Sequence, residues 1–253
     1  MEDKIVVIGL GEMGSVFARG FLKLGYPVYP VTRNMNLAET AAKIPDPRLV
    51  IVAVAESDIH NVIGKLPECW HPHVVLLQNE LLPRDWQNTL KTPTVISVWF
   101  EKKKGQDSKV IIPSPVYGPN AILIKDALAT LDIPCDVLKN NDELLFELVR
   151  KNVYILTSNI AGLAVGGNVG ELWDQHRDFA TNVVKDVLII QEQLTQTTLN
   201  SEPYIKGMVK AFEGDPEHKC MGRSAPQRLA RALQQASDFG VEVPTLNKIN
   251  EKN

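Results

Sequence analysis

Three glycines near the start of the chain stand at a spacing that suits phosphate chemistry. Gly9, Gly11 and Gly14 follow the apolar run 5–8 in the pattern G-x-G-x-x-G, and a helix-like pattern comes directly after them. In such a unit the first glycine allows a tight turn, the second lets the backbone approach a pyrophosphate, and the third lets helix and strand pack closely. The pyrophosphate then lies on the free N–H groups at the start of the helix. The sequence therefore predicts a dinucleotide-binding loop that consists of Gly9, Leu10, Gly11, Glu12, Met13 and Gly14.

The residues after the second expected strand indicate which dinucleotide binds. An acid about 20 residues past the glycines binds the ribose 2′-hydroxyl of NAD, whereas a basic residue suits the 2′-phosphate of NADP. This chain has Thr32, Arg33 and Asn34 at that place, and no acid lies between residues 25 and 39. An arginine can make a bidentate, charge-assisted contact with a phosphate. We therefore expect NADP as the cofactor, with Arg33 on the 2′-phosphate and hydrogen bonds from Thr32 and Asn34.

The elements that must position these residues form an α/β pattern in the first half of the chain. Short apolar runs that are typical of buried strands alternate with segments of helical periodicity. This alternation predicts an N-terminal Rossmann domain with a doubly wound sheet. The expected strands are 5–8, 27–32, 49–55, 74–77, 94–99 and 109–112, and the expected helices are 16–24, 37–43 and 58–63.

The pattern changes near residue 140, where strand signals end apart from the brief run 241–243. The remaining apolar residues recur at helical spacing. The expected helices are 141–164, 172–196, 203–212 and 226–239. The fold class is therefore predicted as α/β, with a Rossmann domain over residues 1–139 and an all-helical C-terminal domain over residues 140–253 that carries substrate binding and catalysis.

Composition limits the classes of partner. The 253 residues carry a net charge of −3, which gives no basic surface for a nucleic acid. Three widely spaced cysteines without a C-x-x-C pair favour neither a disulfide framework nor a zinc site, and they fit a reducing compartment. With no expected leader or membrane span, we predict a cytoplasmic protein without a metal, a nucleic acid or a membrane as partner.

Further positions along the chain match one family. Gln78 and Asn79 follow the fourth expected strand, and Lys151 and Asn159 lie on a helix that leads into residues 168–172, Asn-Val-Gly-Glu-Leu. Together with the glycine loop and Arg33, this series resembles the ketopantoate reductases (2-dehydropantoate 2-reductases), in order and over nearly the whole chain. After the fourth strand the family has Gln-Asn-Gly, whereas this chain has Glu80 after Asn79.

The resemblance implies reduction of a small 2-keto acid, such as ketopantoate, to the 2-hydroxy acid. Lys151 would be the catalytic proton donor, Asn79 would lie near the nicotinamide and the substrate, and Asn159 would bind the substrate. The chemistry is reasonable, because an ammonium can both stabilise and protonate the alkoxide that hydride addition creates. Lys151, Ile155 and Asn159 fall within an arc of about 80° on one helix face. From its residue type alone, Arg223 is a further candidate, as a clamp for a substrate carboxylate.

The chain also departs from the family pattern. Ile155 replaces a second asparagine four residues after the lysine, Ala55 stands near a lysine position after the third strand, and Pro226 replaces a glutamate near the C-terminus. Two alternatives therefore stay open. One is a catalytically degenerate NADP-binding protein, and the other is a β-hydroxyacid dehydrogenase, against which Ile155 argues because that group has a polar residue there. The expected partners are a small-molecule substrate and a second copy in a homodimer.

Overall fold

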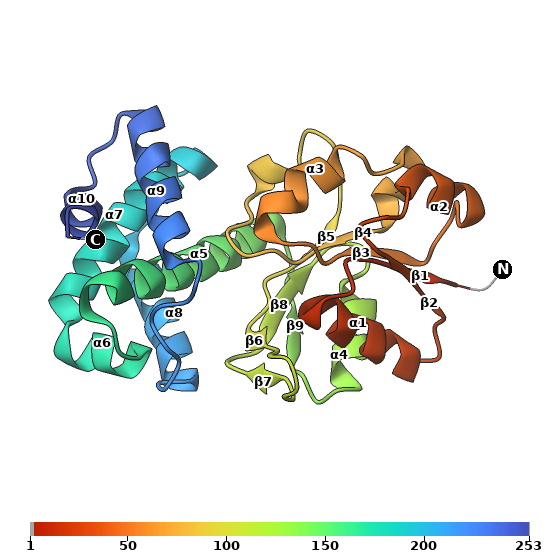
Figure 1. Ribbon diagram of the computed structural model, residues 1–253, viewed down its shortest axis with the longest axis horizontal. Helices are drawn as coiled ribbons and strands as arrows, with labels where there is room; N and C mark the ends of the chain where they lie inside the picture. The colour runs from red at the N-terminus through yellow and green to blue at the C-terminus, as the bar shows by residue number, and fades with distance from the viewer. Residues whose placement is uncertain (1–2, 253) are drawn as a thin grey trace. The chain divides into compact units, whose positions relative to one another are not determined.

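The computed structural model describes residues 3–252 and separates into two compact units, Met1–Glu147 and Leu148–Asn253. The division falls inside one long helix, α5 (Asn141–Val165), so a single helix contributes residues to both units. The first unit is an α/β layer structure, and the second is helical (Figure 1). The expected fold class is confirmed.

The first unit is built on a seven-stranded sheet in the order β2-β1-β3-β4-β5-β8-β9. All neighbouring strands are parallel except β5 and β8, which are antiparallel. The strands are β1 (Ile5–Ile8), β2 (Val28–Val31), β3 (Leu49–Val52), β4 (Val74–Leu76), β5 (Thr94–Ile96), β8 (Ser114–Tyr117) and β9 (Cys135–Val137).

Strand β1 lies at the point where the strand order reverses. The chain leaves β1, forms β2 on one side of it, and then crosses to form β3 on the other side. The register pairs Ile8 with Val31 of β2 and with Val52 of β3, so the carboxyl ends of the three strands coincide. Open α/β sheets bind ligands in the crevice outside such a reversal. The fold therefore brings the segments after β1, β2 and β3 to one place.

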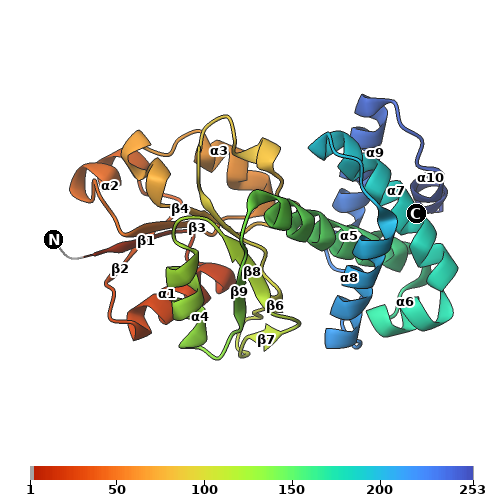
Figure 2. The ribbon, with the colours of Figure 1, turned by 180° about the vertical axis from the view of Figure 1, so that it is seen from behind.

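Helices cover both faces of this sheet. Figures 1 and 2 show α1 and α4 side by side on one face, and α2 and α3 on the other. The core beneath α1 and α4 is apolar and includes the fully buried Phe17 and Phe21 of α1 and Ile124 of α4. Such burial stabilises by about 25 cal/mol for each Å² of apolar surface removed from water. The helices are α1 (Glu12–Lys23), α2 (Leu37–Lys43), α3 (Ile59–Ile63) and α4 (Ala121–Ala129).

The second unit packs its helices around α5, which is buried along the continuous stretch 151–162. A helix that is buried on all sides must be apolar or must have its polar groups paired. Asn152 meets this need, because its Nδ2 donates to Oε1 of Gln191 at 2.9 Å. The other helices are α6 (Val169–Gln175), α7 (Arg177–Thr195), α8 (Ser201–Gly214), α9 (Ala225–Phe239) and α10 (Pro244–Asn250).

Three sequence-based expectations differ from the structure. Residues 109–112 do not extend the main sheet: β7 (Lys109–Val110) pairs with β6 (Phe100–Glu101) in a separate two-stranded sheet. The expected helix 172–196 is two helices, because the backbone of His176 leaves helical geometry at φ −131° and ψ 32°. The run 241–243 forms no strand; it precedes the start of α10.

The three cysteines are free thiols. Cys69 is exposed, whereas burial raises the pKa of Cys135 to about 12 and that of Cys220 to about 11. Within the described residues, no helix has the length and apolar character that a membrane span needs.

Candidate functional site

The glycine loop has the geometry that its spacing predicts. Gly9 has φ +88°, and a Cβ there would lie 2.6 Å from the carbonyl oxygen of Ala53. A Cβ on Gly14 would collide with the carbonyl oxygen of Gly9. Gly11 differs from both, because a Cβ there would meet nothing within 4 Å. The space above Gly11 is therefore open at the start of α1, where a pyrophosphate could approach the backbone and the positive helix end.

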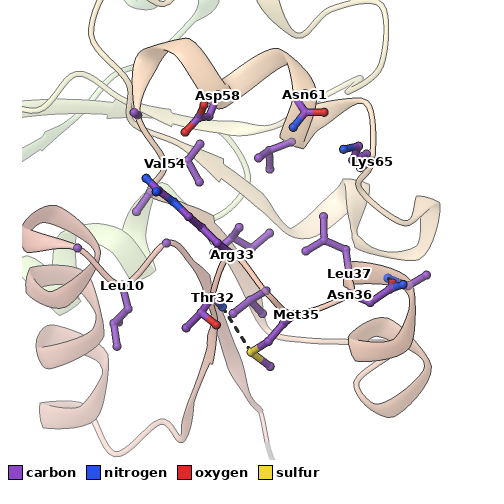
Figure 3. Close-up of a pocket in the computed structure, with 18 residues that line it drawn as sticks. Leu10, Thr32, Arg33, Met35, Asn36, Leu37, Val54, Asp58, Asn61 and Lys65 are labelled. Carbon is purple, nitrogen blue, oxygen red and sulfur yellow. Dashed lines mark hydrogen bonds between the residues drawn. The ribbon is translucent and has the colours of Figure 1, made fainter.

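A cavity of about 1090 Å³ lies at the ends of β1, β2 and β3. Its walls include Gly9, Leu10 and Gly11 of the loop, and Thr32 and Arg33 after β2. Figure 3 shows the Arg33 side chain extended from the end of β2 toward the segment that follows β3. A volume of this size suits a cofactor-sized ligand, which is much larger than a single phosphate group. Five residues of the expected cofactor site do not line this cavity: Glu12, Met13, Gly14, Asn34 and Asn79.

The backbone that carries Arg33 is an ordered turn. The Thr32 N–H donates to Sδ of Met35 at 3.4 Å, and the Met35 N–H donates to the Thr32 carbonyl at 3.0 Å (Figure 3). Asn36 then caps α2, since its Oδ1 accepts from the N–H groups of Ala38 at 2.9 Å and Glu39 at 3.3 Å. Met35 and Asn36 also line the cavity, although their sequence pattern did not indicate a site role.

The opposite wall comes from the segment after β3, and it brings residues that the sequence pattern did not indicate. Asp58, Asn61 and Lys65 all line the cavity there (Figure 3). Asn61 and Lys65 are four residues apart on and just after α3, a spacing that places side chains on one face. Such a pair of polar residues is common on exposed helices. The sequence alone therefore could not identify Asn61 and Lys65 as cavity residues, and the structure does so.

Gln78 connects the ends of β3 and β4. Its Nε2 donates to the carbonyls of Val52 at 2.6 Å and Val54 at 3.3 Å, and its Oε1 accepts from the Leu77 N–H at 3.1 Å. The side chain thus continues the hydrogen bonding of the sheet beyond the last ladder pair, and it fixes the segment that forms the cavity wall.

Asn79 follows Gln78 as a half-buried residue in a turn. The next residue, Glu80, has φ 58°. This left-handed backbone conformation is rare for residues other than glycine, asparagine and aspartate. The chain therefore keeps a backbone that favours glycine at the position where the resembled family has one.

A lysine from a distant part of the first unit reaches the start of α1. Nζ of Lys102 lies 3.2 Å from a carboxylate oxygen of Glu12, and it also donates to the Lys103 carbonyl at 2.9 Å. The Lys102 side chain is 15% exposed and that of Glu12 is 45% exposed. The ion pair offsets the negative charge that Glu12 places beside the glycine loop, where a phosphate would otherwise be repelled.

The helix α5 carries the candidate catalytic residues on one face. Lys151, Ile155 and Asn159 are all buried, at 8%, 7% and 8% exposure. Nζ of Lys151 lies 5.4 Å from the centroid of the Tyr154 ring, which is a cation–π distance.

Asn159 contacts Arg228, an arginine to which the sequence assigned no site role. Nη1 of Arg228, in the first turn of α9, donates to Oδ1 of Asn159 at 2.9 Å. Arg223 is exposed and precedes α9. Pro226 lies at the second position of that helix, where it supplies neither a carboxylate nor an N–H group.

Comparisons with known proteins support the fold. No protein-family model matches this sequence, and no curated protein does. Solved structures do match. A ketopantoate reductase of the PanE/ApbA family from Ralstonia eutropha has a TM-score of 0.67 at 14% identity, over 97% of this chain and 95% of its own. A dimeric ketopantoate reductase from Staphylococcus aureus scores 0.65 at 14% identity, over 97% and 96%.

A third similar structure belongs to a different enzyme. D-mandelate dehydrogenase in complex with NADH and anilino(oxo)acetate has a TM-score of 0.66 at 14% identity, over 98% of this chain and 96% of its own. The alignments span almost the full length of each protein, so the similarity includes both the sheet and the helical part. The chain has the fold of the ketopantoate reductases and of D-mandelate dehydrogenase.

Proposed function

We propose that this protein is an NADPH-dependent oxidoreductase that reduces a small 2-keto acid to the 2-hydroxy acid. The observation that carries the proposal is the cavity at the ends of β1, β2 and β3, which combines the open face of Gly11 with the Arg33 turn. The similar solved structures support it, because they include ketopantoate reductases and a D-mandelate dehydrogenase bound to NADH. The bound nicotinamide would supply the hydride.

The choice of NADPH over NADH rests on Arg33. Its guanidinium lies in the cavity wall after β2, where an acid would be expected in an NAD site. We expect Arg33→Ala to weaken NADPH binding by about tenfold or more, because a charge-assisted contact contributes roughly 1.5–3 kcal/mol. NADH binding should change little. Titration of nucleotide fluorescence measures both, and an unchanged NADPH/NADH ratio would refute the assignment.

In the proposed reaction, Lys151 donates a proton to the carbonyl oxygen as the alkoxide forms, and Asn159 and Asn79 orient the substrate. The pair of Lys151 and Asn159 on one buried face of α5 supports this division of roles. The ammonium lies over the Tyr154 ring, 5.4 Å from its centroid. A positioned general acid contributes about 10²–10⁴-fold to the rate.

The activity is tested by NADPH oxidation with a panel of 2-keto acids, ketopantoate included. Lys151→Ala should lower kcat by about 10²-fold or more while nucleotide binding persists. Lys185→Ala is a matched control, because Lys185 is an exposed lysine on α7. Equal turnover by the wild type and the Lys151 variant would remove Lys151 from the reaction.

Binding of NADPH without turnover is the second candidate function, and buried Ile155 favours it. At 7% exposure, its apolar side chain occupies the face between Lys151 and Asn159, where the resembled family has an asparagine. Tight NADPH binding with no oxidation across the whole panel would establish this reading. The same residue opposes a β-hydroxyacid dehydrogenase, which is tested by including 3-hydroxy acids with NADP in the assay.

We further propose that the protein forms a homodimer, since the similar ketopantoate reductase from Staphylococcus aureus is dimeric. Light scattering coupled to size-exclusion chromatography measures the mass of the particle directly. A mass near 28.1 kDa at micromolar concentration would contradict this assignment.

A further inference from the structure

Lys65 is a charged residue of the nucleotide cavity to which neither the sequence pattern nor the resemblance assigns a role. Among the described residues, three ionisable side chains line this cavity: Arg33, Asp58 and Lys65. Two of the three are cations, so the lining carries a formal charge of +1 at neutral pH. A concave site with an excess of one sign of charge attracts ligands of the opposite sign. The cavity therefore favours an anion, and Arg33 accounts for only part of its positive charge.

The negative charge of the cavity does not neutralise Lys65. Asp58 immediately precedes α3, and Lys65 comes two residues after that helix ends at Ile63. Seven residues of helix advance by roughly 10 Å, so the backbones of the two charged residues lie at opposite ends of α3. Within the described residues, no carboxylate forms an ion pair with Lys65, whose side chain is exposed. Its ammonium is thus available to a ligand in the cavity.

The place of Lys65 along the cavity indicates which part of a ligand it meets. Figure 3 shows Leu10 of the glycine loop and Lys65 on opposite sides of the cavity, with Arg33 between them in that view. The pyrophosphate is placed over the loop, above the open face of Gly11. Because the cavity extends from this loop past the end of β2, it suits the adenosine half of a dinucleotide. Lys65 is therefore remote from the pyrophosphate and lies toward the adenosine end.

Only one anionic group is present in the adenosine half of NADPH besides the pyrophosphate, and it is the ribose 2′-phosphate. The same half of NADH has a neutral hydroxyl there. A lysine binds phosphate as a point charge on a flexible stem, whereas an arginine binds it with a planar fork of donors. We propose that Lys65 binds the 2′-phosphate together with Arg33, so that one cation after β2 and one after α3 select NADPH. This inference rests on the proposed function, because it extends the choice of NADPH over NADH.

The test compares ligands that differ only by the 2′-phosphate. Fluorescence titration gives Kd for NADPH and NADH, and displacement of bound NADPH gives Kd for adenosine 2′,5′-bisphosphate and 5′-AMP, which carry no nicotinamide. The proteins are the wild type, Lys65→Met, Lys65→Arg and the matched control Lys43→Met. Lys43 is an exposed lysine in the last turn of α2 that does not line the cavity, so its variant removes the same charge from a neighbouring helix. Thermal midpoints show that each variant is folded.

We expect Lys65→Met to raise Kd for NADPH and for the bisphosphate by about three- to tenfold, because it removes a charge-assisted contact with an exposed cation. Kd for NADH and 5′-AMP should change by less than about twofold, since a 2′-hydroxyl carries no charge to lose. Lys65→Arg should keep most of the preference, and Lys43→Met should keep all of it. Equal losses for ligands with and without the phosphate, or the same selective loss in Lys43→Met, would overturn the assignment.

The outcomes separate this inference from the function on which it rests. If the wild type prefers NADPH and Lys65→Met keeps that preference in full, the choice of NADPH stands and the role of Lys65 falls. If Lys65→Met selectively loses affinity for the 2′-phosphate ligands but the wild type reduces no 2-keto acid, the role of Lys65 stands and the reductase function falls. If the wild type binds NADPH and NADH equally, the role of Lys65 and the choice of NADPH both fall.

Discussion

Replacing Gly11 by alanine should reduce cofactor affinity while leaving the fold intact. A Cβ at this position meets no atom within 4 Å, and the residue has φ −81° and ψ −162°, which alanine can adopt. The new methyl group would occupy the open space above the backbone where we place the pyrophosphate. Its effect therefore falls on the ligand and not on the protein.

The magnitudes follow from the same geometry. Loss of one charge-assisted hydrogen bond to the pyrophosphate costs about 1.5–3 kcal/mol, which corresponds to a rise in Kd of about tenfold to a hundredfold. The free energy of unfolding should change by less than about 1 kcal/mol, because the lower entropy of the unfolded alanine chain offsets the poorer helix cap. A change of that size shifts Tm by no more than about 2–4 °C.

Gly14→Ala is the matched control, since it alters the same loop by the same methyl group. There the Cβ would collide with the carbonyl oxygen of Gly9, which belongs to the backbone and cannot rotate away. Overpacking of this kind costs typically 1–3 kcal/mol or more. We therefore expect Gly14→Ala to lower the urea midpoint clearly, in contrast to Gly11→Ala.

Fluorescence titration with NADPH gives Kd, and urea denaturation followed by circular dichroism gives stability. The two variants should differ in which quantity changes. Gly11→Ala should raise the Kd for NADPH, whereas Gly14→Ala should lower the free energy of unfolding. A Gly11→Ala protein that is folded and binds NADPH as tightly as the wild type would refute the placement of the pyrophosphate over this loop.

Three further predictions concern charges, strand ends and thiols. Lys102→Met should weaken NADPH binding by roughly threefold because it exposes the loop to the charge of Glu12, and Glu12→Gln in the same chain should restore the affinity measured by titration. Gln78→Glu should destabilise the protein by about 1–3 kcal/mol in urea denaturation, because a carboxylate would face two carbonyl oxygens; unchanged stability would show that the amide does not hold the strand ends. At pH 7, iodoacetamide should modify Cys69 and spare the two buried cysteines, whose raised pKa values leave little thiolate, and mass spectrometry of the native protein would contradict this if three groups were added.

The first unit was predictable where the signal is local. Strands β1 and β3 are continuous apolar, β-branched runs, and both are fully buried. Strand β8 was not predicted from the sequence, because Pro115 lies inside it and Pro113 just before it. Proline within an apolar run argues against a strand. The break between α6 and α7 was not predicted either, because it falls at His176 and not at the glycine or proline that usually ends a helix.

The candidate site likewise contains residues that local sequence predicts and residues that it does not. The glycine loop and Arg33 follow their strands directly, so their spacing in the sequence carries the geometry. Lys65, Lys102 and Arg228 reach their places through tertiary packing from segments whose local sequence is ordinary. No spacing rule connects Arg228 with Asn159, 69 residues away, although Nη1 of Arg228 donates to Oδ1 of Asn159 at 2.9 Å.

The turn between Thr32 and Asn36 has a thermodynamic consequence for ligand binding. Because hydrogen bonds already order its backbone and Asn36 already caps α2, binding need not fold a loop. The conformational entropy lost on binding then comes mainly from side chains such as Arg33, at about 0.5–1.5 kcal/mol for each one immobilised. Calorimetry should accordingly give a heat-capacity change that matches the surface buried by the nucleotide alone, without the additional negative contribution that accompanies coupled folding.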